Sequence, residues 1–204
     1  IKNGTNATPV LGVLKDSSAA RMLLYETPDK NYVLKIYNSS KDSLAAAGKE
    51  MLAFQRFYTK LVTDTGCKNA VVQFLGSAEV VVEEQHQVVF MFEFVPRGDL
   101  FEVINKGAFH TRDSLSKAIV EVLSVVQCLH RAGIVHGDIK PENFLVAEDF
   151  SIKLTDFESL CNFADHPTQC AVRNEVTTQA YARDPRIASP EDSITTADDW
   201  YGVA

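Results

Sequence analysis

Long apolar runs are missing from this sequence. The densest hydrophobic stretch, residues 88–95, is short and contains Glu93, whereas a membrane-spanning helix needs about 20 consecutive apolar residues. Basic charge is also scarce, because 20 lysines and arginines stand against 27 aspartates and glutamates and leave a net charge of −7. A nucleic-acid-binding surface usually requires a basic stripe. We therefore expect a soluble domain with no transmembrane segment and no nucleic-acid partner.

Cysteine is sparse and irregularly spaced. The four cysteines form no C-x-x-C pair, which argues against a zinc site. Cys161 and Cys170 lie nine residues apart in a polar stretch, where a disulfide and two free thiols are equal alternatives. N-x-[ST] triplets occur at Asn3, Asn6 and Asn38, but the triplet is common by chance and indicates export only weakly. Cysteine usage leaves the compartment open.

The composition that remains is that of a globular protein. Hydrophobic residues make up 46% of the 204 residues and charged residues 23%, which predicts one domain or two small lobes. Apolar residues at three- and four-residue spacing predict a helix over 43–61 with Ser43 as its N-cap. Short apolar or β-branched runs bounded by turn residues predict five strands, over residues 10–14, 21–25, 32–37, 71–79 and 87–94.

The chain becomes helical after the linker at residues 96–99. We therefore divide it into an N-terminal lobe, 1–95, and a C-terminal lobe, 96–204. Helices are predicted over 100–106 and 112–132, with Gly133 ending the second as its C′ residue. Short strands are predicted over 144–147 and 152–154, and 158–194 is a long polar loop of a kind that is usually functional or mobile. The apolar stripe of the second helix is expected to be buried and consists of Leu115, Ile119, Val122, Leu123, Val126 and Leu129.

The strongest chemical signal lies in two short segments. Residues 136–143 read H-G-D-I-K-P-E-N, and residues 156–158 read D-F-E. These segments closely resemble the catalytic loop H-R-D-x-K-x-x-N and the metal-binding motif D-F-G of eukaryotic protein kinases. The resemblance implies that Asp138 accepts or orients the substrate hydroxyl and that Lys140 neutralises the moving γ-phosphate. It further implies that Mg²⁺ is held by Asn143 and Asp156.

Two upstream residues resemble the kinase phosphate clamp. Residues 32–36 are similar to the strand whose lysine, here Lys35, contacts the α- and β-phosphates of ATP. Glu50 follows fifteen residues later on the predicted helix, in the place of the glutamate that pairs with that lysine. Taken alone, such charges are usually solvated surface groups. Their order and spacing beside the two catalytic segments favour the clamp.

The segment V-F-M-F-E-F-V resembles the strand and hinge against which adenine lies. In that alignment Phe92 is the gatekeeper, and Glu93 and Val95 offer backbone hydrogen bonds. The resemblance also implies that Asp99 reaches the ribose and that Leu145 forms the floor beneath the base. For the apolar members, an ordinary role in the core is equally compatible.

The resemblance runs from about residue 10 to the end of the chain. Residues 178–181 are similar to the T-x-x-Y that closes the kinase activation segment, and 198–200 to the D-x-W that opens the following helix. The implied fold is α+β: a five-stranded antiparallel sheet with one helix, then a mainly helical lobe. Kinase domains continue past D-x-W with further helices, so we expect residues 1–204 to expose much of a helical core.

The glycine-rich loop of kinases is absent. When Gly12 is aligned with its first glycine, Leu14 and Ser17 occupy the second and third glycine positions. Glycines let that backbone close over phosphates, so nucleotide must be held in another way or is not held.

Three further positions depart from the kinase pattern. Gly137 replaces the arginine that pairs with an activation-loop phosphate, which argues against activation by that route. Glu158 replaces the glycine of D-F-G and either weakens the metal site or adds a ligand to it. Residues 183–185 read R-D-P where A-P-E is expected, so the glutamate that anchors the segment is lost.

The chain lacks the glycine-rich loop but retains the catalytic residues Lys35, Asp138, Asn143 and Asp156. In this it resembles the apicomplexan secreted with-no-Gly-loop (WNG) kinases, relatives of the rhoptry kinases and pseudokinases. The resemblance implies an exported protein of a parasite vacuole or secretory organelle; a cytoplasmic protein is the alternative. The leading function is an ATP- and Mg²⁺-dependent Ser/Thr protein kinase acting on a protein substrate. A pseudokinase that binds a regulatory protein partner is the main alternative, and a small-molecule kinase is a third.

Overall fold

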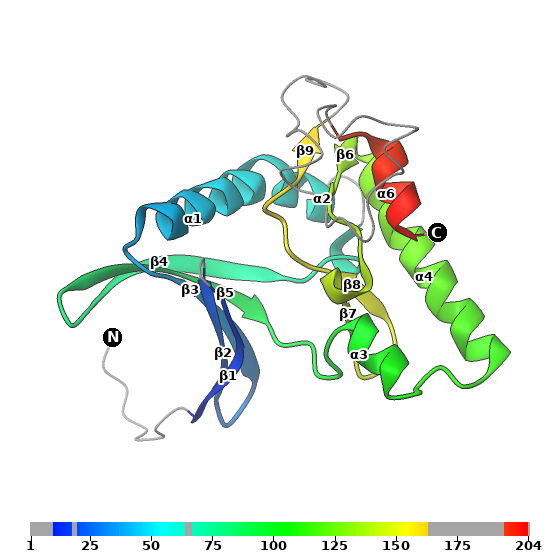
Figure 1. Cartoon of the computed structure of the whole chain (residues 1–204), viewed down its shortest axis with the longest axis horizontal. Coiled ribbons are helices and arrows are strands. Elements are labelled where there is room, and N and C mark those ends of the chain that lie inside the picture. Colours follow the sequence, from blue (N-terminus) through cyan, green and yellow to red (C-terminus); the bar gives the residue numbers. More distant parts are fainter. Residues whose placement is uncertain (1–9, 18–19, 64–66, 163–193, 204) are drawn as a thin grey trace. The chain divides into compact units, whose positions relative to one another are not determined.

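A computed structural model describes residues 10–17, 20–63, 67–162 and 194–203 (Figure 1). The chain divides into two compact units, Ile1–Lys49 with Gln73–Phe94, and Glu50–Val72 with Val95–Ala204. The division after Phe94 lies one residue from the boundary expected from the sequence. It differs from that expectation in assigning residues 50–72 to the second unit. None of the helices in the described ranges has the length and apolar character needed to cross a bilayer.

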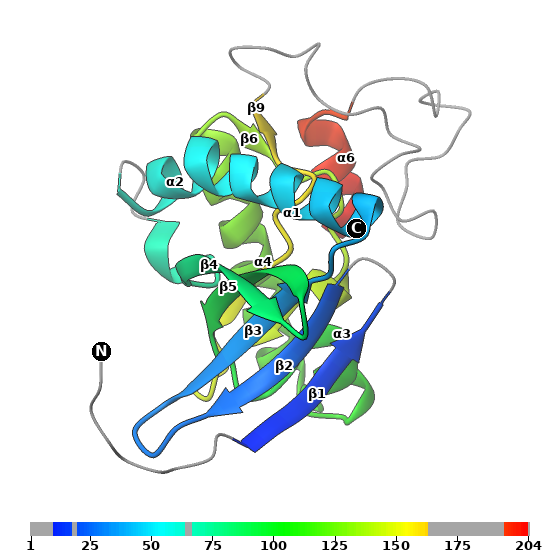
Figure 2. The same ribbon diagram turned by 90° about the vertical axis from the view of Figure 1, so that its left-hand side faces the viewer.

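The first unit is built on a five-stranded sheet in the order β1-β2-β3-β5-β4, in which every neighbouring pair is antiparallel. Figure 2 shows β1, β2 and β3 side by side in that order. The sheet prediction is confirmed, with ends shifted by a few residues. The strands are β1 (Val10–Asp16), β2 (Ala20–Glu26), β3 (Asn31–Tyr37), β4 (Phe74–Val82) and β5 (Gln85–Glu93).

Aromatic side chains fill the buried face of this sheet. The ring of Phe90, fully buried, lies 5.4 Å from that of Tyr37 and 5.8 Å from that of Phe74. Such edge-to-face pairs add to the stability that burial alone provides. Strand β3, the strand that carries Lys35, is thus fixed in the middle of the sheet.

The single helix predicted over 43–61 is a succession of three helical segments: α1 (Lys41–Ala53), a π-helical turn (Phe54–Tyr58) and α2 (Thr59–Thr63). The prediction of Ser43 as N-cap is wrong. Ser43 is fully buried, and its N–H donates to Ser40 Oγ at 3.2 Å. Ser40 comes into that position because its own N–H is held by Asn38 Oδ1 at 2.8 Å, which turns the chain just before the helix.

The second unit is mainly helical (Figure 1). The expected end of the long helix is confirmed, because Gly133 follows it with φ 77°. Two pairs of short strands lie beside the helices. The helices are α3 (Leu100–Asn105), α4 (Arg112–Arg131) and α6 (Thr196–Val203), and the strands are β6 (Ile134–Val135), β7 (Phe144–Val146), β8 (Ile152–Leu154) and β9 (Cys161–Asn162).

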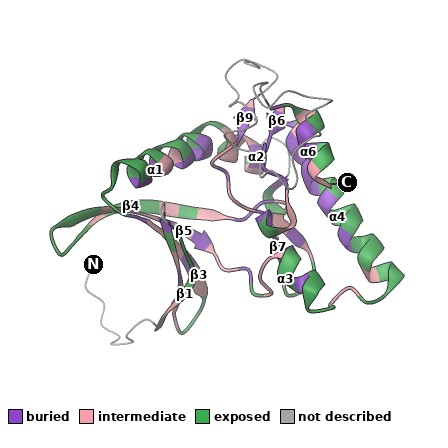
Figure 3. Ribbon diagram, in the orientation of Figure 1, coloured by how far each residue is buried: buried purple, intermediate pink, exposed green. Residues whose placement is uncertain are grey.

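Helix α4 buries only part of its apolar surface, as the mixed colours along it show (Figure 3). Val122, Val126 and Leu129 are buried as predicted, whereas the prediction is wrong for Leu115, Ile119 and Leu123, which are 44%, 48% and 38% exposed. Apolar residues occupy more than one face of α4, so spacing alone did not identify the buried face. The exposed face borders an apolar cavity of about 170 Å³ that α3 and α6 also line.

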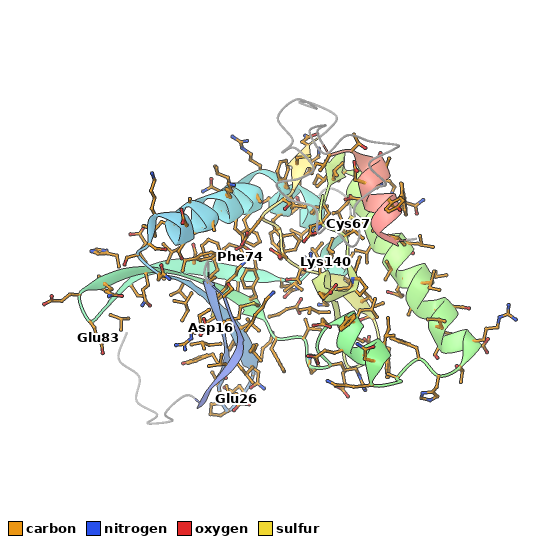
Figure 4. The ribbon with its side chains drawn as sticks, in the orientation of Figure 1. Asp16, Glu26, Cys67, Phe74, Glu83 and Lys140 are labelled. Atoms are coloured by element: carbon orange, nitrogen blue, oxygen red, sulfur yellow. A yellow bond between two sulfur atoms is a disulfide. The ribbon has the colours of Figure 1, made fainter. Side chains whose placement is uncertain are left out.

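A disulfide joins Cys67 to Cys128 across 61 residues of sequence, with the two Cα atoms 6.1 Å apart. Figure 4 labels Cys67 beside α4. Cys67 opens a 3-10 turn (Cys67–Asn69) after α2, and Cys128 lies in the last part of α4. Cys161 is also disulfide-bonded, so the free-thiol alternative is wrong for it. Its expected partner, Cys170, lies outside the described residues.

Candidate catalytic site

The loop after β6 gathers three predicted site residues around one carboxylate. Lys140 Nζ lies 2.5 Å from Asp138 Oδ2, and Asn143 Nδ2 donates to the same oxygen at 3.2 Å and to the Asp138 carbonyl oxygen at 2.8 Å. The side chain of Asp138 is 12% exposed and that of Lys140, labelled in Figure 4, is 19% exposed. Partial burial strengthens these charge-assisted contacts, so Asp138 is held in one orientation at the end of the loop.

The buried carboxylate of Asp199 holds the base of this loop. Its two oxygens accept the N–H groups of His136 and Gly137, each at 2.8 Å. The ring nitrogen Nε2 of His130, on α4, lies 2.9 Å from Asp199 Oδ2. Asp199 is in the first turn of α6, where the helix dipole favours a negative charge. It therefore fixes the backbone directly before Asp138.

Asp199 and His130 are not among the site residues predicted from the sequence. In the D-x-W match Asp199 is the variable residue, and nothing in the spacing shows what it binds. A signal was present nonetheless: two adjacent aspartates open an apolar helix, and a charged group that becomes buried needs partners.

His136 connects the loop to the strand that leads to Asp156. Its Nε2 lies 3.1 Å from the carbonyl oxygen of Thr155, and its Nδ1 lies 3.4 Å from the Asp138 N–H group. The Thr155 N–H donates in turn to the Asn143 carbonyl oxygen at 2.9 Å. The structure thus brings the backbone before Asp156 beside Asn143, as the predicted metal pair requires.

Asp156 has φ 65°, a left-handed conformation that aspartate adopts only at a cost. Strained backbone of this kind persists where its surroundings determine it, and it is frequent at active sites. The next residue provides that constraint. The buried ring of Phe157 lies 5.5 Å from Phe54 and 6.3 Å from Tyr58, both on the π-helical turn.

The donor set of Asn143 and Asp156 fits Mg²⁺. This ion prefers oxygen ligands and is usually bound by one or two protein groups together with substrate phosphates and water. Within the described ranges no group of three His, Cys, Asp or Glu residues is placed to hold a metal ion without such help. Glu158 is half-buried two residues after Asp156, and both alternatives for it, a weakened metal site and an added ligand, stay predictions.

Two of the predicted nucleotide-binding residues lie side by side in the second unit. Asp99 and Leu145 form an isolated antiparallel bridge, and the Val146 N–H donates to the Gly98 carbonyl oxygen at 2.9 Å. Asp99 Oδ1 also accepts the Glu102 N–H at 2.8 Å and so caps α3. Because Oδ1 accepts this hydrogen bond, the predicted contact with ribose would have to use the other carboxylate oxygen of Asp99.

The remaining nucleotide-binding predictions are distributed over both units. In the first unit the Lys35 ammonium lies 5.4 Å from the centre of the Tyr37 ring. The Glu93 N–H is engaged by the Gln73 carbonyl oxygen at 3.0 Å. In the second unit Val95 is buried, and Glu50 is only 1% exposed. The Lys35–Glu50 pair and the hinge contacts stay predictions.

The first hairpin is built without glycine at the two later loop positions. Strand β1 has a bulge between Val13 and Lys15, so Leu14 lies out of register with β2 and is 48% exposed. Ser17 supports the turn itself, because its hydroxyl donates to the Ala20 carbonyl oxygen at 2.8 Å and accepts the Ala20 N–H at 3.1 Å.

Gly137 occupies a position that a side chain would strain. Its φ is 85°, and a Cβ atom built on it would collide with Ile194 Cδ1. The structure thus explains why glycine replaces the arginine of H-R-D: Ile194 fills the space beside the backbone that a side chain would occupy. The T-x-x-Y match at 178–181 and the R-D-P sequence at 183–185 lie outside the described residues.

Comparison with known proteins agrees with this geometry. A model of the protein kinase domain matches residues 19–204. CDPK-related kinase 1 of Arabidopsis thaliana is 30% identical over 76% of this chain, which spans 25% of that protein. A CDPK-related protein kinase of Daucus carota is 27% identical over 86% of the chain and 28% of its own length. Serine/threonine-protein kinase PKH2 of Saccharomyces cerevisiae is 27% identical over 77% of the chain and 14% of its own length.

Proposed function

Because this chain belongs to the protein kinase domain family, we propose that it is an active Ser/Thr protein kinase that transfers the γ-phosphate of ATP to hydroxyl groups of a protein substrate. The relatives that are named as Ser/Thr or CDPK-related kinases support the Ser/Thr class. The chain spans less than a third of the length of each of them, so its activity is proposed from its own residues.

One observation carries the proposal: the carboxylate of Asp138 is held by Lys140 at 2.5 Å and by Asn143 at 3.2 Å. A site without catalytic activity has no need of these three groups around a partly buried charge, because moving a charge out of water is costly. Phosphoryl transfer, by contrast, depends almost entirely on such placement.

In the proposed reaction Asp138 accepts or orients the proton of the substrate hydroxyl. The hydroxyl oxygen forms a bond to the γ-phosphorus, the bond to the β–γ bridging oxygen breaks, and ADP leaves with that electron pair. Lys140 neutralises the charge that develops on the transferred group. Lys35, oriented by Glu50, binds the α- and β-phosphates.

Asn143 and Asp156 would hold the magnesium ion, which when bound neutralises phosphate charge. The hinge backbone at Glu93 and Val95 would bind the base, with Leu145 beneath it and Asp99 near the ribose. These assignments follow the kinase pattern residue by residue.

The test compares Asp138→Asn with a matched control. Asp149 lies in the exposed turn between β7 and β8, so Asp149→Asn changes charge by the same amount away from the loop. We expect Asp138→Asn to abolish phosphate transfer to a mixture of Ser- and Thr-containing peptides and Asp149→Asn to leave it unchanged. Transfer that survives in Asp138→Asn would refute the proposal.

Nucleotide binding is measured separately from transfer. Ligand at 100 times its dissociation constant adds about 2.7 kcal/mol of stability, which raises Tm by about 5–11 °C for a domain of this size. We expect this Mg²⁺-dependent shift with ATP in both the unmodified chain and Asp138→Asn.

The specific observation that favours a pseudokinase is the side chain of Leu14 on the bulge of β1, where the phosphate-covering loop of kinases carries glycine. In that case the fold serves as a scaffold for a regulatory protein partner. The absence of any Tm shift at millimolar Mg²⁺–ATP would select this second function.

We also propose that the chain resides in a secretory compartment. The Cys67–Cys128 disulfide and the disulfide of Cys161 support this location, because disulfides persist in oxidising compartments and are rare in the cytosol. Together with the missing glycines, they favour the secreted WNG group as the subgroup of this chain. Protein extracted from its source cells with immediate thiol alkylation should yield the Cys67–Cys128 linked peptide; alkylated Cys67 and Cys128 would indicate the cytoplasm instead.

A further inference from the structure

We propose that Asn38 carries an N-linked oligosaccharide, an inference that rests on the proposed secretory location and not on kinase activity. Asn38, Ser39 and Ser40 form an N-x-S triplet in the connection between β3 and α1. No role in phosphate transfer involves this triplet, which by its sequence alone indicates export only weakly.

The exposure of the triplet meets the first requirement for a glycan. All three residues are exposed, and Leu44, which follows on the first turns of α1, is 40% exposed. A glycan is bulky and strongly hydrated, so it is compatible with a folded domain only on such a surface. The chain can therefore fold with the sugar attached.

The conformation of the triplet meets the second requirement. Asn38 Oδ1 accepts the Ser40 N–H at 2.8 Å, which closes an Asx turn over the three residues. Since the carboxamide is planar, this bond directs the amide nitrogen Nδ2 away from the backbone. The turn is thus held by Oδ1 and not by Nδ2, the atom that would receive the sugar, and the Ser40 hydroxyl follows two residues later.

The disulfides provide the third, independent observation. N-glycosylation and disulfide formation occur in the same export route, and Cys67 and Cys128 are joined in this chain. A triplet that is a chance occurrence in a cytosolic protein is an available acceptor in an exported one.

The chemistry requires an oligosaccharide linked through C1 to a lipid pyrophosphate. Asn38 Nδ2 forms a bond to C1, and the bond between C1 and the phosphate oxygen breaks. The lipid pyrophosphate leaves with the bonding electron pair, and the amide nitrogen gives up one proton. No oxidation or reduction takes place.

Trypsin isolates this site from the other two triplets. Cleavage after Lys35 and Lys41 releases residues 36–41, in which Asn38 is the sole asparagine, whereas Asn3 and Asn6 fall in residues 3–15. Enzymatic release of N-glycans in heavy-oxygen water converts a glycosylated asparagine into a mass-labelled aspartate. We expect this label at residue 38 in protein from source cells.

Substitutions in the triplet distinguish the acceptor from its surroundings when the chain is secreted from insect cells. Asn38→Gln removes the acceptor. Ser40→Asp destroys the triplet, yet aspartate is as good an N-cap as serine and preserves the start of α1. Ser39→Ala is the matched control, because the middle position tolerates any residue except proline. The first two variants should lose the label completely, and Ser39→Ala should keep it.

The peptide map of source-cell protein separates the two proposals. Linked Cys67–Cys128 with labelled residue 38 supports both. Linked cysteines with unlabelled residue 38 overturn the glycan and leave the location standing. Alkylated Cys67 and Cys128 overturn the location and the glycan together, while the transfer assay with Asp138→Asn decides the kinase activity independently of all three results.

Discussion

Removing the Cys67–Cys128 disulfide is expected to destabilise the second unit strongly. The bond closes a loop of 61 residues, and the chain-entropy relation for cross-links gives about 4 kcal/mol for a loop of that length. Domains of this size lose about 2–4 °C of Tm per kcal/mol, so the double variant Cys67→Ala/Cys128→Ala should melt about 8–16 °C lower. Alanine is chosen because both positions are buried and a serine hydroxyl there would add a desolvation cost of its own.

The assay is thermal and urea unfolding of the double variant beside the oxidised protein. Reductant alone does not isolate this bond, since Cys161 is disulfide-bonded as well. The single variant Cys161→Ala therefore serves as the control: it should respond to reductant by losing the contribution of Cys67–Cys128. A double variant that melts within about 2 °C of the oxidised protein would refute the loop-closure reasoning.

Three further outcomes are expected. Gly137→Ala should lower the free energy of unfolding by about 1–3 kcal/mol in urea. Adding Ile194→Ala should relieve the collision between the new Cβ atom and Ile194 but not the backbone cost of φ 85° at residue 137. A double-mutant cycle should therefore recover only part of the loss caused by Gly137→Ala. Asp199→Asn should cost about 3–5 kcal/mol and abolish phosphate transfer, because an amide cannot accept all the donors that the carboxylate holds. The side-chain hydrogen bond from Ser151 lowers the pKa of Asp149 below 3.8, so Ser151→Ala should raise that pKa in an NMR titration. In the unmodified chain this contact adds a small stabilisation of the folded state. That stabilisation is present above the ordinary pKa of aspartate and is lost as the pH falls through the lowered pKa of Asp149.

Elements with a strong local pattern were predicted well from the sequence. Strand β3 and its neighbours are short apolar or β-branched runs bounded by turn residues, and the end of α4 followed from Gly133, whose positive φ suits the C′ position. The catalytic loop was predictable because residues 136–143, with Asp138, Lys140 and Asn143, closely resemble the kinase motif H-R-D-x-K-x-x-N.

Features that depend on distant parts of the chain were not predictable in the same way. Four cysteines allow three pairings, and Cys67 and Cys128 come together only because the turn after α2 contacts α4. The role of Asp199 depends on where α6 meets the loop at His136. Asp99 differs from Asp199, because it was predicted to contact the ribose and its second role, as the N-cap of α3, depends only on neighbouring residues.

The glycine at position 137, where kinases carry arginine, fits the residues around it. Asp199 requires the Gly137 N–H, and the backbone meets that requirement with φ 85°, which glycine adopts at little cost. The volume that a side chain would occupy there is taken by Ile194, which is buried in one apolar cluster with Val135 and Cys161. Cys161 and Ile194 flank residues 162–193, so both ends of that stretch are held by apolar packing, and Cys161 by a disulfide in addition. The contacts of Cys161 and Ile194 thus do not involve an arginine–phosphate pair at residue 137, where the side chain is absent.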